Sequence, residues 1–278
     1  MNDSDDDPAP TIDRSGYELE VEDRFDRPDL DEQLWIPRYL PHWTTHPASN
    51  ARYEVGAGHL VLRIDEDQPA WSPEYTGGLR VSSLQTGVYA GPKGSGIGQH
   101  RWRDGLVVHE EQPAVRLYAP MYGLFELRAR FGDDPTTMAA LWMIGYEDEP
   151  QRSAEICIVE IFGRDVGVAE TRIGMGVHPF HDTTIRDEFA TVSVPIDARG
   201  SHTYAAEWTP ERVAFYVDDS LVKLVRQSPA YPMQLMLDIF EFPDASTDRT
   251  GTGRYPKTFD VESFRGYRRV AGGRFTPA

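Results

Sequence analysis

A short stretch in the middle of the chain, residues 154–163, carries side chains that could do acid–base chemistry. Within it, Glu155 and Cys157 alternate with apolar residues that are mostly β-branched, which predicts a β-strand with one polar face. Glu160 follows Glu155 by five residues, an odd step that would turn it to the opposite face of a regular strand. One extra residue at positions 158–159, a β-bulge, would return Glu160 to the face of Glu155.

Two glutamates on one face suit the hydrolysis of a glycosidic bond. With the bulge, their Cα atoms would lie roughly 13 Å apart, at about 3.3 Å per residue. Two long side chains that lean together can reduce this to the ~5–5.5 Å that a retaining glycosidase needs between nucleophile and acid/base. The same spacing also fits a solvated strand face that carries two glutamates, and spacing alone does not decide between these interpretations.

The flanking sequence resembles glycoside hydrolase family 16, whose active-site strand reads Glu-aliphatic-Asp-aliphatic-x-Glu. The resemblance extends over residues 115–267, with similar segments in the same order. These are Tyr-Gly-Leu-Phe-Glu-Leu-Arg at 122–128, Ala-Leu-Trp-Met-Ile-Gly at 140–145, His-Thr-Tyr-Ala-Ala-Glu-Trp-Thr-Pro at 202–210, Phe-Tyr-Val-Asp at 215–218 and Pro-Met-Gln-Leu-Met-Leu at 232–237.

This resemblance implies an all-β fold, a jelly-roll sandwich of two curved antiparallel sheets with a concave substrate groove. It also implies a retaining endo-β-glycosidase in which Glu155 is the nucleophile and Glu160 the acid/base. The bulged motif resembles the laminarinase branch of the family, which favours β-1,3-glucan as the substrate. Two alternatives use the same fold: a carbohydrate-binding protein with weak or lost turnover, and a transglycosylase.

Cys157 is the main departure from the family, which has an aspartate between the two glutamates. A thiol is neutral at pH 7 and donates only a weak hydrogen bond, so Cys157 could contact Glu155 without adding charge. The loss of a neighbouring negative charge should make both glutamates easier to ionise. A second departure is the stretch 147–153, which lacks the Trp-Pro pair of laminarinase-like members and with it one sugar-stacking surface.

Further residues are candidates for sugar binding, because aromatic faces and a few polar groups grip neutral sugars. Trp142 matches a family tryptophan near the scissile bond, with core packing as the alternative. His178 matches a family histidine on the neighbouring strand, with a purely structural role as the alternative. Three other side chains are predicted to face the groove: Arg116, Tyr118 and Glu241.

No cofactor is expected for the reaction itself. Several families with this fold hold a calcium ion on the convex face, and Asp23 and Glu262 resemble those ligands in their places along the chain. Calcium takes six to eight oxygen ligands, so these two would supply part of a structural site.

The rest of the chain indicates how the candidate site is positioned. From Val107 onward, short strands recur roughly every 8 to 14 residues with turn residues between them, which predicts a β-sandwich or jelly roll. Residues 1–16 are acidic and are predicted to be a disordered tail before a single catalytic domain at 17–278. The glycine-rich residues 67–105 match no phosphate-binding motif and predict a long surface loop near the cleft.

Composition limits the partners and the location. The chain has 28 basic and 45 acidic residues, a net charge of −17 and a pI near 4.8. This charge repels nucleic acids and anionic membranes but not a neutral polysaccharide or oligosaccharide. The single cysteine excludes an intrachain disulfide. We expect a monomer, located in the cytoplasm because no signal peptide is visible, or secreted if an export signal has been removed.

Overall fold

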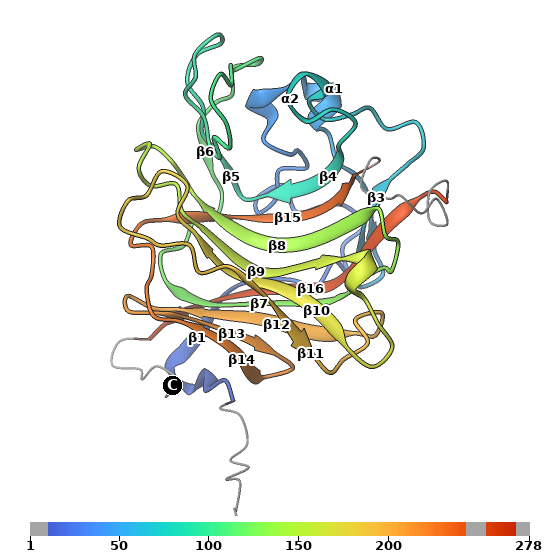
Figure 1. Ribbon diagram of the computed structural model, residues 1–278, viewed down its shortest axis with the longest axis vertical. Helices are drawn as coiled ribbons and strands as arrows, with labels where there is room; N and C mark the ends of the chain where they lie inside the picture. The colour runs from blue at the N-terminus through green and yellow to red at the C-terminus, as the bar shows by residue number, and fades with distance from the viewer. Residues whose placement is uncertain (1–10, 243–253, 271–278) are drawn as a thin grey trace, which may run out of the picture.

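The computed structural model describes residues 11–242 and 254–270, which form two antiparallel β-sheets packed face to face (Figure 1). One sheet has eight strands in the order β14-β13-β12-β7-β16-β3-β2, with β1 paired to β16. Its strands are β1 (Tyr17–Asp23), β2 (Arg52–Gly56), β3 (His59–Ile64), β7 (Gly123–Arg130), β12 (His202–Trp208), β13 (Val213–Val217), β14 (Ser220–Val225) and β16 (Lys257–Arg269).

The second sheet has six strands in the order β11-β10-β9-β8-β15-β4. Its strands are β4 (Arg80–Gln85), β8 (Thr137–Gly145), β9 (Glu155–Phe162), β10 (Thr171–His178), β11 (Ala190–Val194) and β15 (Met233–Glu241). A separate pair consists of β5 (Gly87–Val88) and β6 (Val115–Arg116). The predicted all-β jelly-roll sandwich is confirmed.

The main core fills the space between the two sheets. In β9, the inward side chains Ile156, Ile158, Val159 and Ile161 are all buried in it. Trp208 also lies in this core. Because inward and outward side chains alternate along a strand, this packing directs the polar residues of β9 to the outer face of the six-stranded sheet.

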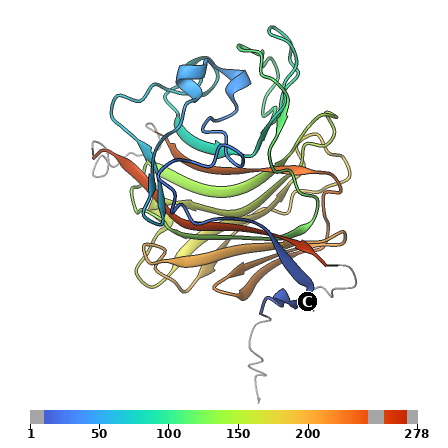
Figure 2. The ribbon, with the colours of Figure 1, turned by 180° about the vertical axis from the view of Figure 1, so that it is seen from behind.

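A second hydrophobic cluster covers part of that outer face, at the side of β4 and β15. It joins outward residues of the sheet to aromatic residues of the loops that carry α1 (His46–Ser49) and α2 (Pro73–Thr76). Both ribbon views place these helices and the β5–β6 pair at the β4 end of the sheet (Figures 1 and 2). The short described helices lack the length and apolarity needed to cross a membrane.

Two predictions about the first hundred residues need correction. Residues 80–85 of the glycine-rich stretch are strand β4, so that stretch is not one continuous loop. Residues 11–16 of the predicted tail are ordered: Ile12 is buried in a cluster with Tyr17, and Arg14 forms ion pairs with Glu126 and Asp219. Ile12 and Arg14 thus hold residues 11–16 in place, although the average composition of the segment is acidic and gives no sign of these contacts. Residues 1–10 lie outside the described residues.

Candidate active site

A β-bulge in β9 brings the two glutamates of the central motif together. In the pairing with β8, Leu141 faces Val159 and the next residue, Trp142, faces Cys157. Ile158 is therefore the extra residue, and both it and Val159 point into the core. The predicted bulge at 158–159 is confirmed.

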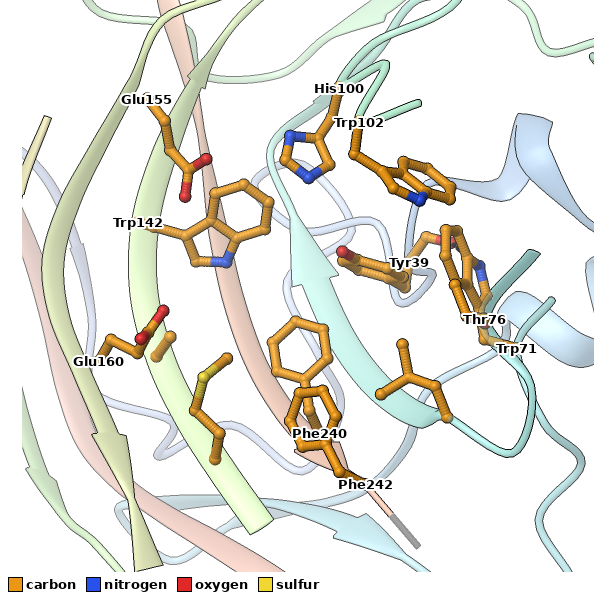
Figure 3. A pocket seen from close by; sticks show the side chains of 13 residues that line it. Tyr39, Trp71, Thr76, His100, Trp102, Trp142, Glu155, Glu160, Phe240 and Phe242 are labelled. Atoms are coloured by element: carbon orange, nitrogen blue, oxygen red, sulfur yellow. Dashed lines mark hydrogen bonds between the residues drawn. The ribbon is translucent and has the colours of Figure 1, made fainter. Parts of the chain in front are cut away.

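Glu155 and Glu160 consequently line the same cleft on the outer face of the six-stranded sheet (Figure 3). Figure 3 shows Trp142 between them, with both carboxyl groups directed into the cleft. The glutamates project from a strand that is paired on both sides, so their backbone positions are fixed by β8 and β10. The interpretation as a fully solvated strand face is wrong, because Glu155 is only 8% exposed.

Burial dominates the electrostatics of this pair. It raises the pKa of Glu155 to about 8, an effect that the Cys157 hydrogen bond opposes and the charge of Glu160 reinforces. Burial also raises the pKa of Glu160 to about 7. The pair therefore holds a single proton near neutral pH, as a retaining glycosidase requires. The higher pKa of Glu155 favours the proton on that residue, so the form with ionised Glu155 and protonated Glu160 is the minor one in the free protein.

Cys157 lies between the glutamates and touches the first of them. Its thiol donates a hydrogen bond to Glu155 Oε1 over 3.1 Å. Burial, reinforced by the neighbouring carboxyls, raises the pKa of Cys157 well above its ordinary value, so the thiol keeps its proton. The predicted contact without charge is confirmed, although the ease of ionisation expected for Glu155 is outweighed by burial.

Trp142 forms the floor of the cleft and is held from behind. Its indole N–H donates to the side-chain oxygen Oδ2 of Asp238 on the neighbouring strand β15. Burial raises the pKa of Asp238 to about 8. The predicted position of Trp142 in the cleft is confirmed, and its contact with sugar stays a prediction.

The opposite side of the cleft is built by residues that sequence reasoning missed. Tyr39, Trp71 and Trp102 come from loops, and Phe240 and Phe242 from the end of β15 (Figure 3). For Trp71 and Trp102 the glycine-rich residues 67–105 gave a general signal, since they predicted a loop near the cleft, but no pattern singled out these two residues within it.

His100 is a further missed residue, and a network of hydrogen bonds fixes it. It has a left-handed φ of 52°, and its backbone N–H donates to Glu147 Oε1 over 2.5 Å. The preceding Gln99 side chain donates to the carbonyl of Tyr146 and to the Gln234 side chain. Burial lowers the pKa of His100 to about 4, so the ring is neutral at physiological pH and offers a polar edge to the cleft.

His178 lies beside the cleft, whereas three other predicted groove residues lie elsewhere. His178 pairs with Glu155 in the sheet register, so both side chains are on the outer face, and its ring contacts Asp187 and stacks on Phe189 at 4.6 Å. Phe180 lies between the rings of His178 and the cleft residue His100, and contact of His178 with sugar stays a prediction. Arg116 lies on the β5–β6 pair, where its guanidinium covers the ring of Tyr146 at 3.9 Å.

Tyr118 and Glu241 are the other two corrections. Tyr118 reaches the eight-stranded sheet and donates to Glu20 over 3.1 Å. Glu241 follows the cleft residue Phe240 in β15 and therefore points to the other face, where it pairs with Arg80 at 2.9 Å.

The two predicted calcium ligands do not share a site. The Asp23 carboxylate accepts hydrogen bonds from Trp35 Nε1 at 3.0 Å and from the Phe25 backbone at 2.9 Å. Glu262 is paired with Arg128 at 2.7 Å and with Arg130 at 2.6 Å. Within residues 11–242 and 254–270, no group of three or more His, Cys, Asp or Glu side chains is placed to hold a metal ion.

Comparison with known proteins gives a family match over the region of the site. The model of the family described as glycosyl hydrolases family 16 matches residues 118–258. A β-glucanase of Rhodothermus marinus is 34% identical over 199 residues, which cover 69% of this chain and 56% of the relative. The endo-1,3-1,4-β-glycanase ExsH of Rhizobium meliloti (strain 1021) is 30% identical over 137 residues, 48% of this chain and 28% of the relative. The chain thus spans about half or less of these two relatives.

Solved structures show the same fold. The GlcNAcα1-4Gal releasing endo-β-galactosidase from Clostridium perfringens superposes with a TM-score of 0.80 at 29% identity, over 96% of this chain and 66% of that one. The laminarinase catalytic domain from Thermotoga maritima MSB8 gives a TM-score of 0.62 at 18% identity, over 92% of this chain and 100% of that one.

Proposed function

Because this chain belongs to glycosyl hydrolase family 16, we propose that it is a retaining endo-β-glycosidase that hydrolyses a β-linked polysaccharide. The observation that carries the proposal is the bulge of β9, which directs both Glu155 and Glu160 into one cleft beside Trp142. A retaining mechanism requires two carboxyl groups in this relation.

The chemistry uses the form of the pair in which Glu155 is ionised and Glu160 holds the proton. Ionised Glu155 attacks the anomeric carbon while Glu160 gives its proton to the leaving oxygen, and a glycosyl-enzyme ester forms. Glu160, now ionised, takes a proton from water, which attacks the same carbon and releases Glu155. The thiol of Cys157 helps to hold the Glu155 carboxylate in position through its hydrogen bond.

For the substrate, we favour β-1,3-glucan. The bulged motif supports it, and the names of the Rhodothermus and Rhizobium relatives describe a β-glucanase and an endo-1,3-1,4-β-glycanase. A β-galactoside is the second candidate, because the Clostridium endo-β-galactosidase superposes more closely than the laminarinase, with a TM-score of 0.80 against 0.62.

The test is the release of reducing sugar from β-1,3-glucan, mixed-linkage glucan, agarose and β-galactan, by wild type and by Glu155→Gln. We expect wild type to cut one of these polymers and Glu155→Gln to lose activity by roughly a thousandfold or more, because it has no nucleophile. Glu66→Gln, at an exposed turn, is the matched control and should retain activity.

Two results would contradict the proposal. Wild-type turnover by Glu155→Gln would mean that this residue is not the nucleophile. If the protein binds one of these polymers but releases reducing sugar from none of them, the carbohydrate-binding alternative is supported. NMR of the first product adds the stereochemistry, since a retaining enzyme releases the β-anomer, and transglycosylation would appear as products longer than the substrate.

A further inference from the structure

The cleft that contains Glu155 and Glu160 has a wall on the side of β4. Three aromatic residues form it: Tyr39, Trp71 and Trp102, which we call the aromatic wall. Figure 3 shows these side chains standing across the cleft from the two glutamates, with His100 at one edge. Their rings pack on one another, with centroids 4.7 Å apart for Tyr39 and Trp71 and 5.2 Å apart for Trp71 and Trp102.

Hydrogen bonds and packing hold the aromatic wall in place. The Trp71 indole N–H donates to the carbonyl of Tyr39 over 3.0 Å, which ties two loops together. Trp102 packs against Trp43, which is fully buried and donates to the Gln99 carbonyl over 2.7 Å. A wall tied to its surroundings in this way cannot swing aside as a single mobile side chain would.

Behind the aromatic wall, the outer face of the sheet is covered by protein. Val81 on β4 and Met236 on β15 belong to the same hydrophobic cluster as the wall, and their exposed fractions are 1% and 0%. A glycan that crosses the strands from the glutamates toward β4 therefore meets packed side chains. On the other side, β10 and β11 follow β9 in the sheet.

From these observations we infer that the enzyme cuts an internal bond close to one end of the glycan, because the cleft receives the end of the chain and not a long stretch from its middle. The terminal sugars pack against the aromatic wall, and the remainder of the chain leaves past Glu155 and Glu160 toward β10 and β11. Trp102 offers the accessible ring face, because it is only partly buried, whereas Tyr39 and Trp71 are 5% and 2% exposed and support it by packing. An aromatic face suits this role, because sugar rings present apolar C–H faces. The inference rests on the proposed function and adds that each cut releases a short oligosaccharide of fixed length.

Binding stoichiometry tests the inference without turnover. Glu155→Gln is titrated by calorimetry with size-fractionated β-1,3-glucan and β-galactan chains of several lengths. If the cleft is closed on the side of β4, binding should saturate at one protein per glycan chain, whatever the length of the chain. The two ends of a glycan differ chemically, and only one of them fits the cleft. A number of bound proteins that rises with chain length would overturn the inference.

Product analysis by mass spectrometry tests the same point with the wild-type enzyme. One short product should accumulate from the start of the reaction while the viscosity of the polymer falls slowly. Early products of many lengths, with a rapid loss of viscosity, would mean an open groove and would leave the proposed function intact. If one protein binds per glycan chain but wild type cleaves no glycan, the closed cleft is supported and the proposed hydrolysis is contradicted.

Variants of the wall connect the result to its cause. Trp102→Ala should open the cleft and add longer products, whereas Trp102→Phe keeps an aromatic ring and should retain the wild-type product. Thermal unfolding of both variants shows whether they are folded. Products of unchanged length from folded Trp102→Ala would contradict the role of the wall, and a lack of both binding and cleavage on every glycan would overturn the proposed function and this inference together.

Discussion

At the scale of single residues, the two glutamates and the thiol between them control the proposed reaction. Burial raises the pKa of Glu155 to about 8 and that of Glu160 to about 7, and the two titrations are coupled. At low pH both carboxyl groups are protonated and no nucleophile is present. At high pH both are ionised and no acid is present. Activity should therefore be greatest where the pair holds one proton, at neutral to mildly alkaline pH.

Substitution of Cys157 should move this profile along the pH axis. Cys157→Ala removes the donor to Glu155, so the pKa of Glu155 rises and the pH range in which the pair holds one proton moves to higher pH. Cys157→Ser supplies a stronger donor and should move it to lower pH. The loss of one hydrogen bond of about 1 kcal/mol corresponds to a change of roughly 0.7 in the pKa of Glu155.

The measurement is kcat/KM against pH, which reports the free enzyme. The two variants are each other's control, because both leave a small neutral side chain at the same site. Superimposable pH profiles for Ala, Ser and wild type would show that the thiol does not influence ionisation of the pair.

At the scale of secondary structure, the bulge of β9 is accommodated by a glycine of β10. The register shifts between Gly174 and Gly176, because the three steps from Glu160 to Cys157 in β9 face two steps in β10, and Gly176 faces Cys157. Gly176 has a φ of +142°, and a Cβ atom there would lie 2.3 Å from the Glu188 carbonyl oxygen. The position thus excludes a side chain both by its backbone conformation and by lack of space.

Gly176→Ala should accordingly destabilise the protein and disturb the site. Backbone strain alone costs about 1–3 kcal/mol, and the contact with the Glu188 carbonyl adds to it. Gly58→Ala is the control, since Gly58 has a φ of +83° but no atom within 4 Å of the position that a Cβ atom would take. It should lose only about 1 kcal/mol.

Urea unfolding of both variants measures the difference in free energy of unfolding. We expect Gly176→Ala to lose clearly more stability than Gly58→Ala and to lose activity under conditions in which it is still folded. Equal losses would mean that β10 can shift to make room, so that its register is not a fixed support for the bulge.

At the scale of the whole molecule, charge selects among polysaccharides. The net charge is −17, and the described residues that line the cleft include neither Lys nor Arg. The cleft lining also contains His100, whose lowered pKa of about 4 keeps its imidazole ring neutral. An anionic glycan would therefore meet repulsion outside the cleft and no cation within it.

Salt should affect neutral and anionic glycans differently. Binding of a neutral β-glucan to Glu155→Gln should change little between about 0.01 M and 0.15 M salt, over which the Debye length falls from about 30 Å to about 8 Å. A sulfated form of the same glucan should bind more weakly, and its affinity should rise with salt. Tighter binding of the sulfated glucan at low salt would contradict this expectation.

The sequence by itself determined the fold class, the strand with the two glutamates, the bulge and the place of Trp142 in the cleft. These features depend on local rules: side chains alternate along a strand, and one extra residue reverses the alternation. Arg116, Tyr118 and Glu241 were wrong because proximity along the chain does not decide the face or the sheet to which a side chain belongs. Phe240, next to Glu241, is the residue that faces the cleft.

Only the tertiary structure decided what stands opposite the glutamates. Tyr39, Trp71 and Trp102 belong to loops without a regular period, and contacts between distant segments set their positions. The Trp71 bond to Tyr39 spans 32 residues, and the bond of Gln99 to Gln234 spans 135. Such contacts exist only once the two sheets have formed, because the strands then bring the ends of the loops together. The shape of the cleft is therefore a property of the folded chain, whereas both members of its acid–base pair lie in a single strand and can be read from the local sequence.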